Sequence, residues 1–166
     1  MHLLRDALPP LRGRATLSSP RFAIAVLGTP FRGDDAVGPR VGELLRGEGI
    51  EVLDCGDEPT RLIEHLEGLD VAVVVDAVRT GSPPGTVHVV EVADGPLPAE
   101  LGLASTHAFG VGEALELARM LGRAPRRVVI VGVEGAAFGM GDPVTPQVEA
   151  ALAGAAEQVL RTIGGV

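Results

Sequence analysis

The chain has 166 residues, 46% of them hydrophobic and 2% aromatic, which suits one domain with a sizeable core and excludes a large multidomain protein. Its formal net charge is −8 and all 14 basic residues are arginines, so nucleic acid and anionic membranes are not expected partners. The single cysteine, Cys55, excludes an internal disulfide and a cysteine-based zinc cluster, which fits a reducing cytoplasm.

The first 20 residues differ from the rest of the chain. They are rich in Pro, Arg and Ser and show no sustained hydrophobic period, so we expect a loose extension ahead of a single domain over residues 21–166. The sequence contains no apolar run of about 18 residues and no apolar core of a secretory signal. We therefore expect a cytoplasmic protein.

From residue 21 onward, strand-like and helix-like patterns alternate. Continuous or alternating apolar runs predict strands at 22–27, 50–53, 69–75, 86–92 and 128–133. Helical spacing predicts helices after Asp34 and Asp35, after Pro59, at about 108–121, and from Pro146 to the carboxyl end. No helix precedes 86–92, which favours an antiparallel orientation for that strand. The alternation predicts an α/β fold, a three-layer α/β/α sandwich with a mostly parallel sheet.

Candidate functional residues follow the predicted strands, because ligands of open α/β sheets bind outside the carboxyl ends of the strands. The polar residues at these positions are Asp34 and Asp35, Asp54 and Asp57, Asp76, and the stretch from Ser105 to His107. Of the four histidines, only His107 is predicted in this layer. Two carboxylates and one imidazole around an open position suit a divalent metal such as nickel or zinc.

Each candidate also has a purely structural alternative. Asp34 is a natural helix N-cap, and Asp76 could simply accept hydrogen bonds from a neighbouring loop. His107 could be a loop histidine with ordinary hydrogen-bond partners. Cys55 has no histidine nearby in the sequence, so a packed thiol is expected rather than a nucleophile.

Four motifs, in order along the chain, are similar to those of a known family. They are Val26–Gly38 with its Asp34–Asp35 pair, Val75–Ala77 around Asp76, Ser105–Gly110 around His107, and Val131–Val133 followed by Thr145–Val148. Together they resemble the hydrogenase maturation endopeptidases, which trim the carboxyl-terminal extension from the large subunit of nickel-iron hydrogenases. The resemblance runs from about Arg21 almost to the end of the chain.

The resemblance implies a five-stranded mixed sheet with one antiparallel strand. It implies that Asp35, Asp76 and His107 are the catalytic residues and contact nickel, which the active site of the substrate supplies, and that Asp34 supports the loop. The implied partner is the precursor of a nickel-iron hydrogenase large subunit. The chain departs from the family pattern at Thr29 and in the turn that contains Cys55 and Asp57, positions that bear on substrate choice.

Two further readings stay open at this point. The same three side chains would serve a non-catalytic nickel-sensing chaperone or binding module for the large subunit. A hydrolase acting on another small substrate ranks lower, because the sequence lacks a nucleophile motif. The scarcity of aromatic residues favours a monomer that docks transiently.

Overall fold

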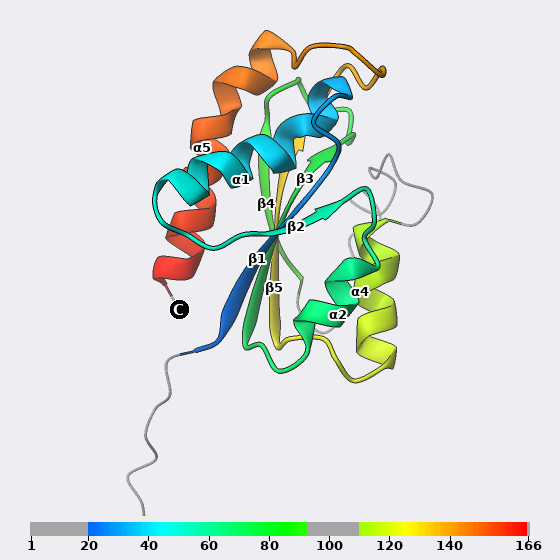
Figure 1. The fold of residues 1–166 in the computed structure, drawn as a ribbon, viewed down its shortest axis with the longest axis vertical. Helices are drawn as coiled ribbons and strands as arrows, with labels where there is room; N and C mark the ends of the chain where they lie inside the picture. The colour runs from blue at the N-terminus through cyan, green and yellow to red at the C-terminus, as the bar shows by residue number, and fades with distance from the viewer. Residues whose placement is uncertain (1–19, 93–109, 166) are drawn as a thin grey trace, which may run out of the picture.

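One mixed sheet organises the molecule, with its strands in the order β2-β1-β3-β5-β4 (Figure 1). The computed structural model describes residues 20–92 and 110–165. The strands are β1 (Phe22–Leu27), β2 (Leu53–Gly56), β3 (Val71–Val78), β4 (Val87–Val92) and β5 (Arg127–Glu134). The helices are the 3-10 turn η1 (Gly33–Ala36), α1 (Val37–Gly47), α2 (Arg61–Leu66), α4 (Val111–Met120) and α5 (Pro146–Gly164).

The strand register gives three parallel pairs and one antiparallel pair. β1 lies parallel to β2 and to β3, and β3 lies parallel to β5 along its whole length, from Val71 opposite Arg127 to Val78 opposite Glu134. β4 runs antiparallel to β5 at the edge. The amino end of β4 therefore lies beside the carboxyl ends of the parallel strands.

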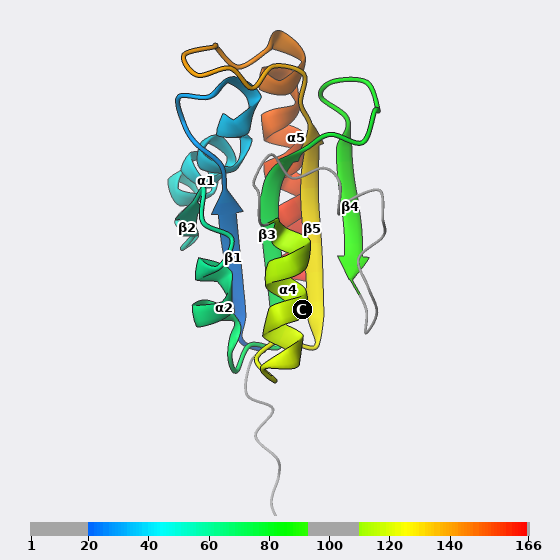
Figure 2. The same ribbon diagram turned by 90° about the vertical axis from the view of Figure 1, so that its right-hand side faces the viewer.

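Helices cover both faces of the sheet, so the central strands are apolar on both sides. α1 and α5 pack on one face and α2 and α4 on the other (Figures 1 and 2). Val73 and Val75 of β3 face the first pair of helices, whereas Ala72 and Val74 face the second. All eight residues of β3 are buried, and this places Asp76 in the interior.

The sheet order places a topological switch point between β1 and β3. The chain leaves β1 through α1 to reach β2 on one side, and it leaves β3 toward β4 and β5 on the other side. The carboxyl ends of two such strands form the usual ligand position of an open α/β sheet. The loops after β1 and before α5 both lie at this end (Figures 1 and 2).

The predicted fold class is confirmed, and the strand limits differ most at β2 and β3. β2 begins at Leu53 rather than residue 50, because Ile50 and Val52 pack against the core from an irregular segment. β3 continues two residues past Asp76, so this residue lies within a strand rather than after it. No helix in residues 20–92 or 110–165 combines the length and the apolar character needed to cross a membrane.

Candidate functional site

Two glycines allow the turn after β1 to bring Asp35 to the end of the sheet. Gly28 has a φ of 118°, and a Cβ atom there would collide with the carbonyl oxygen of Asp35. A Cβ atom at Gly38 would collide with the carbonyl oxygen of Leu27. Because glycine has no Cβ atom at either position, η1 and the first turn of α1 pack directly against the end of β1.

The turn places Asp35 beside Asp76 at the topological switch point between β1 and β3. Both side chains are buried, with exposed fractions of 0% and 4%. One carboxylate oxygen of Asp35 accepts the backbone N–H of Thr29 at 2.9 Å, and one of Asp76 accepts the N–H of Ala77 at 2.8 Å. Two acidic side chains thus meet in a site with little water, one from the first turn and one from the central strand.

The proximity of these two carboxyl groups changes the protonation of Asp76. Burial, together with the negative charge of Asp35, raises the pKa of Asp76 to about 8, although the N–H of Ala77 acts in the opposite direction. The Asp76 carboxyl therefore holds a proton at neutral pH. A divalent cation at this position would favour the charged form and release that proton.

Asp34 has a different task from its neighbour. Its carboxylate accepts the backbone N–H groups of Thr145 at 2.7 Å, Ala136 at 2.8 Å and Ala137 at 3.0 Å, and the Thr145 hydroxyl donates to it as well. Burial raises the pKa of Asp34, but these donors outweigh burial and the net pKa is lowered. The predicted N-cap is wrong, because the side chain joins the β1 turn to the segment before α5 instead.

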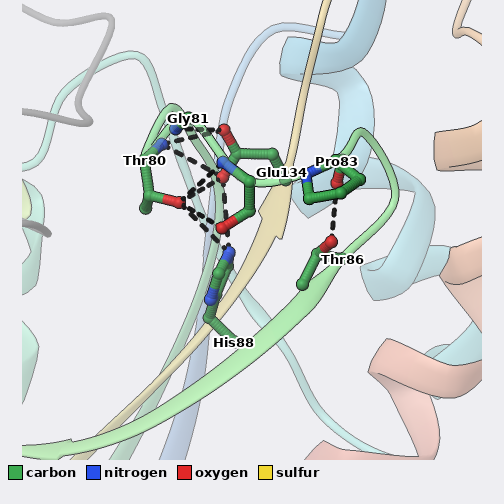
Figure 3. A network of polar contacts seen from close by, with 7 residues as sticks. Thr80, Gly81, Pro83, Thr86, His88 and Glu134 are labelled. Carbon is green, nitrogen blue, oxygen red and sulfur yellow. Dashed lines mark hydrogen bonds and ion pairs between the residues drawn. The ribbon is translucent and has the colours of Figure 1, made fainter.

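A further buried carboxylate, Glu134, was not predicted from the sequence. It ends β5 and accepts the N–H groups of Thr80 at 2.8 Å and Gly81 at 2.9 Å, together with the Thr80 hydroxyl at 2.8 Å (Figure 3). Nε2 of His88 lies 3.3 Å from the same carboxylate. Glu134 thereby fixes the connection between β3 and β4. An acidic residue closing the last apolar strand was the available signal.

His88 lies in the same row of the sheet as Asp76. Gly132 of β5 pairs with Asp76 on one side and with His88 on the other, so the three positions point to one face of the sheet. The prediction that only His107 among the histidines belongs to this layer is wrong, because the antiparallel edge strand brings its amino end here. The His88 side chain contacts the Glu134 carboxylate, which also accepts hydrogen bonds from the loop between β3 and β4.

Replacing Glu134 by Gln is expected to lower the free energy of unfolding by about 1–3 kcal/mol, since an amide nitrogen would then face backbone donors of Thr80 or Gly81. Urea unfolding measures this loss, and limited proteolysis should show faster cleavage within residues 79–86. The matched control is Glu91→Gln, which removes an exposed carboxylate paired with Arg127. Equal losses in the two variants would contradict the assigned role of Glu134.

The other predicted site residues fall into two groups. Asp54 and Asp57 are exposed, and the Asp54 carboxylate accepts the N–H of Gly56 at 2.9 Å, so neither joins Asp35 and Asp76. His107 lies outside the described residues. In the part of the chain that is described, no three His, Cys, Asp or Glu side chains gather as a metal site.

The single cysteine is a packed thiol, as expected. Cys55 is fully buried in the core under α2 and α4. Burial raises the pKa of its thiol to about 11, against a smaller opposing effect of Arg61. A thiol with this pKa is protonated at neutral pH, which argues against a role as nucleophile.

Comparison with known sequences places these observations in a family context. A family model described as hydrogenase maturation protease matches residues 40–162. The chain is 35% identical over 150 residues to the hydrogenase expression/formation protein HupM of Azotobacter chroococcum mcd 1, covering 83% of this chain and 71% of that protein. It is 29% identical over 150 residues to the hydrogenase 2 maturation protease of Escherichia coli K12, covering 86% and 90%.

Solved structures share the fold. The hydrogenase maturating endopeptidase HybD from Escherichia coli superposes with a TM-score of 0.71 at 24% identity, covering 87% of this chain and 93% of that one. The [NiFe] hydrogenase maturation protease HybD from Thermococcus kodakarensis gives a TM-score of 0.70 at 25% identity, with 86% and 99% covered.

Proposed function

Since this chain belongs to the hydrogenase maturation protease family and is an endopeptidase, we propose that it removes the carboxyl-terminal extension of a nickel-iron hydrogenase large-subunit precursor. Cleavage follows nickel insertion, and the metal is the one that the precursor carries in its own active site. Asp35, Asp76 and His107 contact that metal, so that only a loaded precursor is cut.

The observation that carries this proposal is the burial of Asp35 and Asp76 side by side at the carboxyl ends of β1 and β3. Two buried carboxyl groups repel one another when both are charged, and a divalent cation between them would offset that repulsion. Carboxylate oxygens together with an imidazole are a suitable ligand set for nickel. His107 comes three residues before Gly110, the N-cap of α4.

In this proposal, the protonation of Asp76 links nickel loading of the precursor to cleavage. Without a cation the protonated carboxyl is a hydrogen-bond donor and not a base. When a loaded precursor binds, the charged form is favoured and the Asp76 carboxylate becomes able to accept a proton from an attacking water. Polarisation of the scissile carbonyl by the precursor's nickel is the alternative source of catalysis.

The decisive experiment is mass spectrometry of the nickel-loaded and nickel-free precursor after incubation with catalytic amounts of this protein. We expect loss of a carboxyl-terminal peptide from the loaded precursor only. Replacement of Asp76 by Ala is expected to slow processing by at least about 100-fold, since a positioned base contributes that much or more. The folded state of the variant is checked by circular dichroism.

Asp70→Ala is the matched control. Asp70 is an aspartate that directly precedes β3, and it pairs with Arg126 at the end of the sheet opposite Asp76. Its processing rate should stay close to that of the unmodified protein. Retained cleavage by the Asp76→Ala variant would refute the assigned site. An unchanged precursor mass together with a lasting complex would instead assign a nickel-sensing chaperone.

A further inference from the structure

Two large apolar side chains project from the loops that flank the candidate site. Phe31, in the loop after β1, is 74% exposed, and Met140, in the loop before α5, is 76% exposed. The loops touch, because the N–H of Gly141 donates to the carbonyl oxygen of Phe31 at 2.8 Å. Both lie at the carboxyl ends of the parallel strands (Figures 1 and 2). When a partner covers exposed apolar surface, the free energy of the system falls, so such surface favours binding.

These loops are held in place before any partner arrives. The N–H of Gly33 donates to the carbonyl oxygen of Asp142 at 3.1 Å, and the N–H of Asp34 donates to that of Ala137 at 2.7 Å. The buried Asp34 carboxylate adds its bonds to the same segment. A surface fixed in this way loses little conformational entropy on binding, so more of the contact energy appears as affinity.

Positive charge accompanies the two apolar side chains. Nε of Arg32 donates to the carbonyl oxygen of Phe138 at 3.1 Å, and the guanidinium of Arg79 lies 4.0 Å from the centre of the Phe138 ring. Over residues 20–92 and 110–165, neither guanidinium pairs with a carboxylate. In a chain of net charge −8, these two arginines both contact Phe138, one at its backbone carbonyl and one at its ring, and so place positive charge beside the two loops.

We propose that Phe31, Met140, Arg32 and Arg79, here called the loop platform, dock a polypeptide segment of the precursor that carries an apolar side chain close to an acidic one. The inference rests on the proposed function and names the surface that recognises its substrate. The platform is continuous with the site, because Phe31 and Arg32 stand in the same turn as Asp35. The apolar pair supplies contact area, and the arginines supply charge complementarity.

Steady-state processing of the nickel-loaded precursor tests the loop platform. The double variant Phe31→Ser/Met140→Ser is expected to raise KM about tenfold or more, with kcat changed less than twofold, because docking contacts are lost while Asp35 and Asp76 are untouched. Arg79→Glu is expected to raise KM similarly. In the unmodified protein KM should rise with salt concentration, and in Arg79→Gln this dependence should weaken.

Matched controls lie elsewhere on the surface. Met120→Ser alters an apolar side chain that is 84% exposed at the end of α4, and Arg161→Glu reverses an exposed charge on α5. Both should leave KM and kcat near those of the unmodified protein. All platform positions are at least partly exposed, and the thermal midpoint of each variant shows whether the fold is retained.

A binding measurement separates failure of the loop platform from failure of the proposed function. The Kd for the loaded precursor is measured by calorimetry on an Asp76→Asn background, with and without the two Ser substitutions. Cleavage with unchanged KM and Kd in the platform variants would overturn the platform and leave the function standing. If the platform variants bind the precursor more weakly and the unmodified protein cleaves nothing, the loop platform is upheld. The proposed function is then overturned. Absence of both binding and cleavage would overturn both.

Discussion

Replacing Asp34 by Ala is expected to lower the free energy of unfolding by roughly 3–5 kcal/mol, one of the largest losses available to a single side chain here. The substitution removes the acceptor of three backbone N–H groups, those of Ala136, Ala137 and Thr145, and of the Thr145 hydroxyl. Each donor is then left in a partly buried place without its partner. Urea or thermal unfolding followed by circular dichroism measures the loss.

The loop before α5 supplies the matched control. Asp142 also accepts a backbone N–H, that of Gly139 at 2.9 Å, but its carboxylate is exposed. Asp142→Ala is expected to cost less than about 1 kcal/mol, since water replaces the lost bond. If Asp34→Ala cost no more than Asp142→Ala, the assignment of Asp34 as the link between the two loops would be wrong.

Replacing Asp76 by Asn is expected to stabilise the protein at alkaline pH and to change its stability little at acid pH. The folded-state pKa of about 8 exceeds the ordinary value of 3.8, so the folded state binds more protons than the unfolded state between these values. Stability from this group is therefore fully present below about pH 4 and is lost as pH rises toward 8. The amide cannot ionise, so near pH 8 the variant should be more stable by about 3–5 kcal/mol.

Urea unfolding of both proteins at pH 4.5 and pH 8 measures this difference, and comparison of the two proteins cancels the other titrating groups. Asp70→Asn is the control with the opposite sign. The N–H of Arg21 and the guanidinium of Arg126 lower the pKa of Asp70, so removing its charge should destabilise at neutral pH. A constant difference between Asp76→Asn and the unmodified protein at all pH values would contradict the raised pKa.

Most of the fold could be predicted because the signals are local. The valine-rich run before Asp76 and the apolar run 128–133 both form central strands, and the Thr145–Pro146 step precedes a helix as expected. The limits of β2 could not be predicted, because Ile50 and Val52 pack against the core from an irregular segment just as they would from a strand. Hydrophobicity alone does not distinguish the two arrangements.

The candidate site was predicted in part. Asp35 and Asp76 were among the polar residues predicted to follow strands, the family resemblance implied these two, and the structure brings them together. Glu134 and His88 were missed because their significance depends on the antiparallel pairing of β4 with β5. The roles of His107 and nickel, the monomeric state and the cytoplasmic location stay predictions.

The sequence by itself determined the order and kind of the elements and the end of the sheet where the candidate aspartates gather. These follow from periodicity and from residues at strand ends, which neighbouring positions in the chain define. The tertiary structure decided which carboxylates link loops through hydrogen bonds and which one holds a proton. Asp34 finds its donors 102 to 111 residues away and Glu134 finds Thr80 54 residues away, while burial beside Asp35 keeps Asp76 protonated. Hydrogen bonding and burial depend on contacts between remote segments, which only the folded chain creates.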